Sequence, residues 1–291
     1  MSIAPNPSTS TEIPVAQVQT PVVPQRLDRE AMIRRIKALG PWHMNIQLTD
    51  ELNSGEVFAE NGVKRGRENG GTGGDVSLLQ LRDLFLRQID SIYPDGLADK
   101  TFLDCACNAG GYCFWTRERE IESAFGFDVR EHWIKQARFV KTQRQVSPTD
   151  RIQFRVNDLY DIPSQNLTPF DITMFKGIFY HLPDPITGLK IAADLTKEVM
   201  FFNTSTTWGE EDGSMKSGWE SKENVMSGVH GLKWYPTGPK VCADILKWAG
   251  FVEMKLMFYR QQFDTPNIGR TEIIASKVPG LLDGLKGEWI K

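Results

Sequence analysis

The sequence lacks any apolar run of about 18 residues, the length a helix needs to cross a membrane. Its N-terminus also lacks the basic segment and the apolar segment that together make a secretory signal peptide. Cysteine is scarce, at four residues, so no disulfide framework is indicated. These deficits predict a cytoplasmic protein with no membrane partner.

The sequence also lacks a strong excess of charge of one sign, since its formal net charge is −3 at pH 7. Nothing global therefore indicates a nucleic-acid surface, although a local basic patch remains compatible with this composition. Cys105, Cys107 and Cys113 lie close together, but a zinc site would need a fourth ligand and a different spacing. No metal site is expected.

Residues 100–128, KTFLDCACNAGGYCFWTREREIESAFGFD, organise the rest of the chain. A short apolar run ends at Asp104 and predicts a buried strand, and residues 108–111 predict a tight turn. Residues 122–127 predict a second strand, which closes with Asp128. An acidic residue in that place can accept hydrogen bonds from both ribose hydroxyls, while the N–H groups of the turn approach the ligand. The stretch therefore predicts a site for a nucleoside with a polar tail.

A complete glycine pattern is missing from this turn. A nicotinamide dinucleotide needs G-x-G-x-x-G to seat its pyrophosphate, whereas residues 106–111 read A-C-N-A-G-G. S-adenosylmethionine carries no phosphate and needs a less strict loop. A turn that binds no ligand is the remaining alternative, although the motif further along the chain argues against it.

The rest of the chain alternates between strand and helix patterns. Further strands are expected at 151–157, 170–175, 198–202, 251–259 and 271–276, the last two as a hairpin, and helices at 27–40, 75–93, 131–144, 185–195 and 237–249. This alternation predicts an α/β fold with an open, mostly parallel sheet of seven strands and helices on both faces. Residues 41–48 are expected to be extended, and residues 278–291 to form a short helix or tail.

Composition divides the chain into three segments. Residues 1–26 are rich in Pro, Ser and Thr and are expected to be disordered. Residues 27–99 are expected to form a helical extension with a glycine-rich segment, 61–75, which is either a flexible loop or a lid over a cofactor. Residues 100–291 form the main domain. It carries an insertion, 203–235, whose aromatic content favours a functional loop over disorder.

Two motifs carry a family resemblance. Residues 103–110, LDCACNAG, resemble the D-x-G-x-G-x-G motif of the class I SAM-dependent methyltransferases, with Ala106 and Asn108 departing from its glycines. Residues 170–185, FDITMFKGIFYHLPDP, resemble F-D-x-V-x-x-x-G-V-L-Y-H-x-x-x-P of the tRNA 5-methoxyuridine/carboxymethoxyuridine methyltransferase-like family. Looser matches at residues 42–43, 234–236 and 270–271 extend the resemblance over roughly residues 40–276. It implies a Rossmann-like methyltransferase fold with an antiparallel last strand.

The resemblance implies which residues would bind S-adenosylmethionine and its product S-adenosylhomocysteine. Asp104 would accept from the methionine amine, Asp128 would bind the ribose, and Asp158 would bind the adenine amino group unless it only caps a helix. Lys176 would lie at the methionine end or in solvent. The full expected set is Asp104, Ala106, Asn108, Gly110, Asp128, Asn157, Asp158, Leu159 and Lys176.

The loop that contains Tyr180 and His181 follows the predicted fourth strand, at the edge where ligands bind in such sheets. His181 is the main candidate for a general base, because an imidazole titrates near neutrality, and Tyr180 would orient the acceptor or cofactor. A purely structural hydrogen bond is the alternative for His181, and His43 and His230 are weaker base candidates. The expected substrate residues are Trp208, Trp234, Tyr235, Arg270 and His43.

The sequence therefore predicts a SAM-dependent methyltransferase that methylates a hydroxyl on a small molecule or glycan. Methyl or carboxymethyl transfer to the wobble uridine of tRNA ranks second, because the D-x-A-C-N-A-G motif looks more like stand-alone relatives than like the tRNA enzymes. A catalytically silent SAM-binding protein ranks third. The acceptor and the oligomeric state are left open.

Overall fold

The computed structural model describes residues 26–59, 78–145, 151–220, 226–262 and 265–290. The predicted disorder of the tail falls almost wholly outside these ranges, and so does the predicted lid segment at 61–75. None of the helices in the described ranges is long and apolar enough to cross a membrane.

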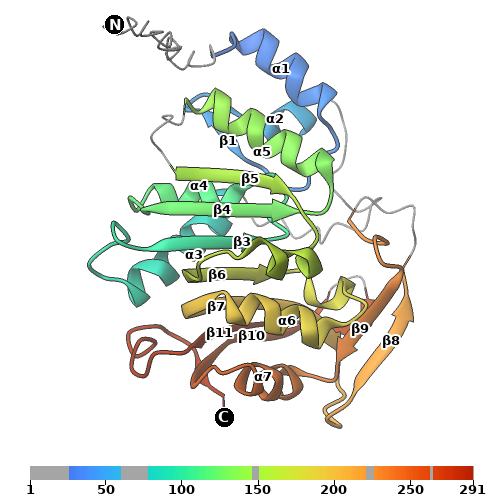
Figure 1. The fold of residues 1–291 in the computed structure, drawn as a ribbon. Coiled ribbons are helices and arrows are strands. Elements are labelled where there is room, and N and C mark those ends of the chain that lie inside the picture. Colours follow the sequence, from blue (N-terminus) through green and yellow to red (C-terminus); the bar gives the residue numbers. More distant parts are fainter. Residues whose placement is uncertain (1–25, 60–77, 146–150, 221–225, 263–264, 291) are drawn as a thin grey trace, which may run out of the picture.

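An eight-stranded sheet forms the centre of the protein, in the order β12-β10-β11-β7-β6-β3-β4-β5 (Figure 1). Five neighbouring strands, from β7 to β5 in that order, run parallel, and β11 is antiparallel to both β7 and β10. The strands are β3 (Thr101–Cys105), β4 (Ser123–Asp128), β5 (Arg151–Val156), β6 (Phe170–Lys176), β7 (Thr196–Thr207), β10 (Glu253–Gln262), β11 (Thr265–Ser276) and β12 (Glu288–Trp289). The predicted Rossmann-like methyltransferase sheet with an antiparallel last long strand is confirmed.

The chain leaves β3 towards β4 on one side and resumes at β6 on the other, so a switch point lies between β3 and β6.

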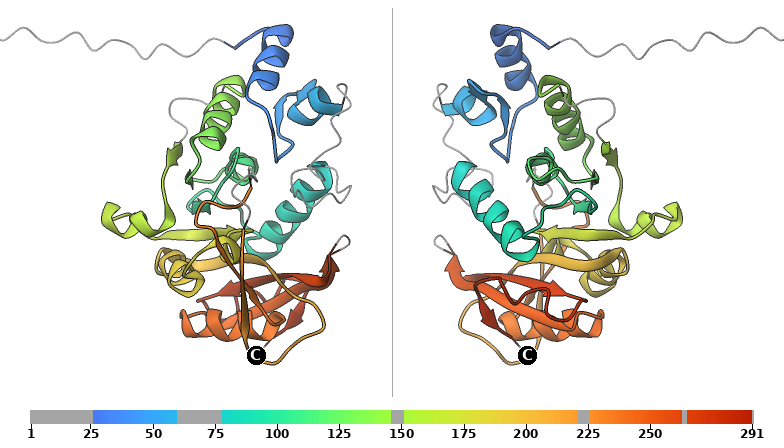
Figure 2. Two further views of the ribbon diagram at one scale, coloured as in Figure 1. Left: turned by 90° about the vertical axis from the view of Figure 1, so that its right-hand side faces the viewer. Right: turned by 90° about the vertical axis from the view of Figure 1, so that its left-hand side faces the viewer.

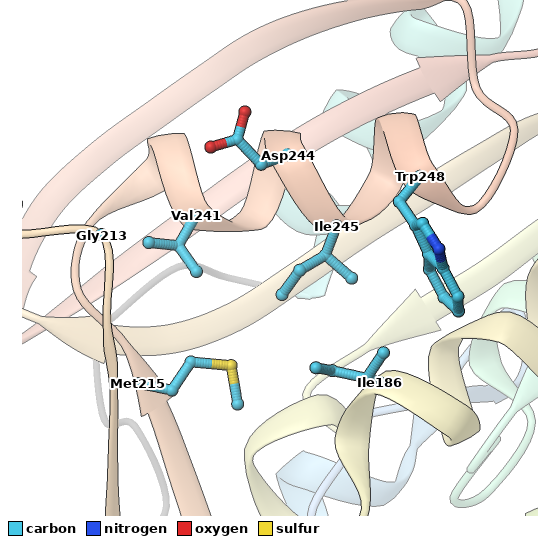
Figure 3. Close-up of a pocket in the computed structure, with 7 residues that line it drawn as sticks. All are labelled: Ile186, Gly213, Met215, Val241, Asp244, Ile245 and Trp248. Atoms are coloured by element: carbon cyan, nitrogen blue, oxygen red, sulfur yellow. The ribbon is translucent and has the colours of Figure 1, made fainter.

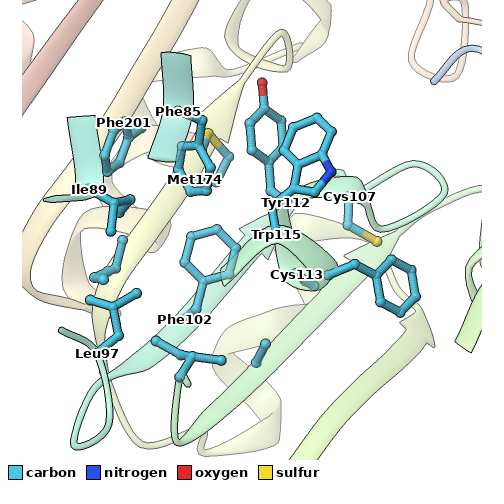
Figure 4. Close-up of a cluster of buried hydrophobic side chains, with 14 of the residues drawn as sticks. Phe85, Ile89, Leu97, Phe102, Cys107, Tyr112, Cys113, Trp115, Met174 and Phe201 are labelled. Atoms are coloured by element: carbon cyan, nitrogen blue, oxygen red, sulfur yellow. The ribbon is translucent and has the colours of Figure 1, made fainter. Parts of the chain in front are cut away.

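Both faces of this sheet are buried, because successive side chains of its strands enter two different cores. In β7, Val199 and Phe201 join one cluster, while Met200 and Phe202 join the other. Figure 4 shows the first cluster, in which Phe85, Phe102 and Trp115 converge. Figure 2 shows α3 on one side of the sheet and α6 on the other. The first face carries α3 (Leu78–Ile92), α4 (Gly111–Arg117) and α5 (Glu131–Gln143); the second carries η1 (Leu159–Gln165), α6 (Pro185–Asp194) and α7 (Pro239–Trp248).

The N-terminal extension packs as a small unit against α5. It comprises α1 (Arg29–Ala38), the strand pair β1 (Gln47–Thr49) and β2 (Leu52–Asn53), and α2 (Ser54–Ala59). Asp28 begins α1 by accepting the N–H of Ala31 (2.7 Å), as an N-cap residue does. Gln136 of α5 holds the extension by donating to the carbonyls of Leu39 (2.6 Å) and Pro41 (2.8 Å). Of the predicted extended segment 41–48, only Gln47–Leu48 lies in a strand.

The largest departures from the predicted elements lie in the C-terminal half. β7 continues through Thr207, where the sequence suggested the end of a strand near residue 202. The insertion then forms a two-stranded ribbon, β8 (Met215–Trp219) and β9 (Leu232–Pro236), which extends from the sheet edge in Figure 1. The predicted hairpin is present, but its strands reach Gln262 and resume at Thr265. The helix or tail expected near the C-terminus is instead a series of turns followed by β12, which adds an eighth strand.

Gly110 offers a test of how tightly the turn after β3 is packed. Its φ is +81°, and an added Cβ would lie 2.6 Å from two ring carbons of Phe154. Gly110→Ala is therefore expected to lower the free energy of unfolding by about 2–4 kcal/mol in urea denaturation, from backbone strain plus overpacking. Gly96 is the matched control, because it has a φ of +92° but open space around its Cβ position. Equal losses for both alanine variants would show that the Phe154 contact contributes nothing.

Candidate functional site

Three residues of the turn after β3 adopt left-handed φ angles. These are Ala106 (φ 55°), Asn108 (φ 52°) and Gly110 (φ 81°). The turn is closed by the N–H of Cys107, which donates to Phe127 O (2.8 Å), and by the N–H of Gly110, which donates to Cys107 O (2.8 Å). The positive φ of Ala106 and Asn108 shows that this turn keeps a glycine-type backbone without its glycines.

Asp128 lies at the carboxyl end of β4, beside this turn, and is 5% exposed. Its carboxylate accepts the N–H of Asn108 (3.1 Å) through Oδ2 and the N–H of Arg130 (3.0 Å) through Oδ1. Burial raises the pKa of Asp128, and these two N–H donors partly oppose that rise. Each oxygen keeps a second lone pair, so the carboxylate can accept further hydrogen bonds from a ligand.

Asp104 is a second carboxyl group in the same place, 2% exposed, in β3. Burial, followed by the charge of Asp128, raises its pKa well above the usual range. Its side-chain partner among the described residues is the weak thiol donor of Cys113, at 3.9 Å. Because the charge of Asp128 disfavours the ionised form of Asp104, a ligand that carries positive charge would stabilise the two carboxyl groups.

The end of β5 brings the next group of predicted residues beside β4. The N–H of Asn157 donates to Asp128 O (3.0 Å), whereas Asn157 Nδ2 is buried without a partner in the described part of the chain. Asp158 caps η1 by accepting the N–H of Tyr160 (3.0 Å), and its other oxygen lies 3.5 Å from His230 Nε2. Leu159 is buried in the second core. The unpaired amide of Asn157 is therefore free to bind a ligand, while the Asp158 carboxylate already has two partners.

Lys176, the last residue of β6, belongs to a buried polar network that the sequence did not reveal. Its Nζ contacts Glu272 Oε2 at 2.6 Å, and Glu272 also accepts from Asn203 Nδ2 (3.2 Å) and Gln88 Nε2 (3.4 Å). Burial alone would lower the pKa of Lys176, but the charge of Glu272 outweighs it and raises the pKa. Lys176 is therefore a protonated, neutralised group and no proton acceptor.

Arg270 of β11 connects this network to the loop after β6. It donates through Nε to Asn203 Oδ1 (2.7 Å) and through one terminal nitrogen to Tyr180 Oη (3.3 Å) and Ser205 Oγ (3.2 Å). The ring of Tyr180 stacks with that of Tyr235, with centroids 6.1 Å apart. Tyr180 and Arg270, which are 90 positions apart in the sequence, thus meet at the carboxyl end of β6.

Two further groups around Arg270 have shifted pKa values. His43 is an exposed residue, but the burial of part of its ring and the positive charge of Arg270 lower its pKa, so the N-terminal extension contributes a neutral imidazole. Burial, followed by the charges of Tyr180 and Glu220, raises the pKa of Tyr235 to about 12. Tyr235 therefore keeps its proton near neutrality.

His181 lies in η2 (Phe179–His181), directly after β6. Its Nδ1 is hydrogen-bonded to Oε1 of Glu220, a residue that follows β8. Burial would raise the pKa of Glu220, but the hydrogen bond and charge of His181 outweigh this and lower it. The site therefore holds an ionised carboxylate against one nitrogen of the imidazole.

The tryptophans of the insertion lie in different surroundings. Trp234 Nε1 donates to Pro183 O (3.0 Å), which holds β9 on the loop that carries His181. Trp208 packs on Tyr259, with ring centroids 4.7 Å apart, and its described contacts do not reach the Tyr180 group. Trp219 is 81% exposed. Of the aromatic residues expected to bind substrate, Trp234 and Tyr235 adjoin the loop that carries His181, and Trp208 does not.

A hollow of about 440 Å³ lies elsewhere, between α6, α7 and β8 (Figure 3). Its lining is mostly apolar: Ile186, Gly213, Met215, Val241, Asp244, Ile245 and Trp248. None of these residues belongs to the predicted site. Among the described residues, no group of three His, Cys, Asp or Glu side chains could hold a metal ion.

Glu220, Glu272 and Asn203 are the site residues that sequence reasoning did not identify. Glu220 left no signal in the sequence, because its contact with His181 spans 39 positions. Glu272 and Asn203 are buried polar residues in strands. Their signal in the sequence is weak, since a single polar residue in a strand more often faces solvent.

Residues 97–262, more than half of the chain, match the sequence profile of a family described as "Methyltransferase domain". The tRNA U34 carboxymethyltransferase of Campylobacter fetus subsp. fetus (strain 82-40) is 34% identical over 94 residues, 32% of either chain. The ubiquinone biosynthesis O-methyltransferase of Acinetobacter baylyi (strain ATCC 33305 / BD413 / ADP1) is 30% identical over 129 residues, 44% of this chain and 52% of the relative. The chain thus spans about half or less of the curated relatives it matches.

Among solved structures, the N-terminal domain of EvdMO1, crystallised in the presence of SAH and D-fucose, matches with a TM-score of 0.64. The match covers 86% of this chain and 97% of that one, at 20% identity. At this identity the likeness establishes a shared fold.

Proposed function

The chain belongs to the methyltransferase-domain family, and from this premise we propose that it is a SAM-dependent methyltransferase acting on a hydroxyl of a small molecule or glycan. The observation that carries the proposal is the His181–Glu220 pair at the end of β6. A hydroxyl acceptor needs a base that can take up a proton and tolerate the resulting positive charge. His181 has an anionic partner for that charge.

His43 is the competing base, and its surroundings oppose the same step. The positive charge of Arg270 lowers the pKa of His43, so protonating this ring places two cations together. Tyr235 and Lys176 are not available as proton acceptors, because raised pKa values keep both of them protonated near neutrality. Electrostatics therefore favours His181 over His43, Tyr235 and Lys176.

The residues of the turn fit S-adenosylmethionine, which when bound supplies an activated methyl group on a positively charged sulfur. Asp128 would hold the ribose, and Asn157 Nδ2 would gain the partner that it lacks in the described chain. Asp104, a buried carboxyl without a basic partner, would bind the methionine ammonium group. The charge of this donor set matches a cationic ligand rather than a pyrophosphate.

At the acceptor end, His181 Nε2 would take the hydroxyl proton as the acceptor oxygen bonds to the methyl carbon and the bond between that carbon and the sulfonium sulfur breaks, which would leave S-adenosylhomocysteine. Tyr180, held by Arg270, and Tyr235 would orient the acceptor through their hydroxyl groups. Trp234 would keep the β9 strand over the loop. The transfer needs little more from the protein than this positioning and one proton acceptor.

A first experiment separates the proposed acceptors. Purified protein with labelled SAM is incubated with D-fucose, a phenol, or unmodified tRNA, and methyl incorporation is measured. Transfer to the sugar or the phenol supports the proposal, and the curated O-methyltransferase relative supports testing oxygen acceptors. Transfer to tRNA alone would replace it with wobble-uridine modification, as the tRNA U34 relative suggests. Binding of SAM without transfer to any acceptor class would favour a silent SAM-binding protein.

The thiols support a cytoplasmic location. All four cysteines are free and buried, so each can remain a thiol in a reducing compartment. We propose this location on that ground.

A further inference from the structure

Glu220 is fixed at three points beside His181. Its carboxylate contacts His181 Nδ1 through Oε1 and accepts the N–H of Gly228 (2.7 Å) through Oε2. Its own N–H donates to Gly231 O (2.9 Å), and its side chain is only 4% exposed. These contacts fix the position of the Glu220 carboxylate. The orientation of the His181 ring is therefore set by the carboxylate.

An ionised carboxylate can only accept a hydrogen bond, so its contact with Nδ1 requires a proton on that nitrogen. The lone pair of the neutral ring then lies on Nε2, which no described residue binds. We infer that Glu220 is a positioning residue that holds His181 in the tautomer whose Nε2 can take the acceptor proton. This inference rests on the proposed function and extends it to a residue of the insertion.

The same contact acts once the proton has moved. The ring becomes a cation whose Nδ1–H faces the ionised Glu220 carboxylate, and a charge-assisted hydrogen bond of this kind is stronger than a neutral one. The low pKa of Glu220 keeps it ionised throughout. The insertion thereby supplies the carboxylate partner of His181, which the rest of the methyltransferase domain does not provide.

A purely structural clamp is the competing interpretation, because Glu220 also joins the ribbon to the loop after β6. The Trp234–Pro183 hydrogen bond performs that clamping independently. The tautomer of His181 separates the two interpretations, since a clamp alone has no effect on which nitrogen carries the proton. This readout needs neither acceptor nor cofactor.

The test uses full-length protein with ¹⁵N-labelled histidine and long-range ¹H–¹⁵N spectra. The four histidines are assigned by single substitution. In wild-type protein, neutral His181 is expected to carry its proton on Nδ1. Glu220→Gln is expected to convert most of it to the Nε2–H form, because the amide can donate to Nδ1. Glu210→Gln is the matched control, since Glu210 is an exposed carboxylate of the same insertion that pairs with Lys216. It is expected to leave the tautomer unchanged.

With an acceptor in hand, Glu220→Gln is expected to lower kcat by about 100-fold or more at unchanged acceptor KM and SAH affinity. Glu220→Asp should restore part of the rate, because it keeps the charge. A wild-type tautomer in Glu220→Gln, or an unchanged kcat, overturns the inference even if His181→Ala is inactive. Full activity of His181→Ala instead overturns the proposed base itself, so the two failures are distinguishable.

Discussion

Replacing His181 by alanine is expected to lower kcat by about 10²–10⁴-fold while SAH affinity stays close to that of the wild type. The reason is that the imidazole is the proposed proton acceptor and the described contacts do not place it among the expected cofactor residues. His181→Gln can retain a hydrogen bond to the ribbon, but it should remain slow because an amide cannot take up the proton. The measurement is steady-state kinetics with the acceptor found by the screen, together with calorimetry of SAH binding.

The pH dependence of the rate adds a second criterion. Wild-type kcat is expected to rise with pH, because only the neutral form of the proposed base can take up the proton, and this rise should be absent from the His181 variants. His132→Ala is the matched control, since His132 lies on α5 and contacts Pro41 O and Gln136. It should keep both the rate and the rise. If His181→Ala keeps most of its activity, the base has to be sought at His43 or His230.

The turn after β3 was predictable from the sequence because its determinants are local. The apolar run of β3, the small residues of the turn and the closing Asp128 act over fewer than 30 positions, within the range of periodicity and turn chemistry. The start of α6 was readable for the same reason. Asp184 caps it by accepting the N–H of Thr187 (3.2 Å), and Pro185 follows at its first position.

The end of β7 was not predictable, because its residues look like a loop. Residues 203–207 read N-T-S-T-T, yet each is 7% exposed or less. They are buried because β11 pairs with them along one side, from Thr207↔Ile268 to Asn203↔Glu272. The polarity of this stretch comes from the network around Arg270 and Glu272, and a pattern based on hydrophobicity alone is blind to such a network.

His181 and Glu220 also differ in how far the sequence predicted them. The loop with Tyr180 and His181 was readable because a strand that ends in a polar loop marks the ligand edge of a parallel sheet. Glu220 was not readable, because its position depends on how the ribbon β8–β9 folds back on that loop. Local patterns thus located the histidine but not the carboxylate that orients it.

Replacing Asp128 by alanine is expected to weaken SAH binding by about 1–3 kcal/mol, or roughly 5- to 150-fold. The carboxylate lies at the end of β4 with one fixed N–H donor on each oxygen, so its remaining lone pairs have a set direction. Ribose hydroxyls that donate to it would form charge-assisted hydrogen bonds, which alanine cannot replace. Isothermal titration calorimetry of purified protein with SAH measures the loss without any acceptor.

The Asp128 variant also removes an acceptor from Asn108 and Arg130, so folding has to be monitored separately. Asp128→Asn retains the size and one acceptor oxygen, and it should fold like the wild type while binding SAH less tightly. Asp90→Asn is the matched control, because Asp90 pairs with Arg119 on the surface, and it should bind SAH normally. Wild-type affinity in both Asp128 variants would remove this residue from the ribose site, and binding of NADH in place of SAH would point to a dehydrogenase.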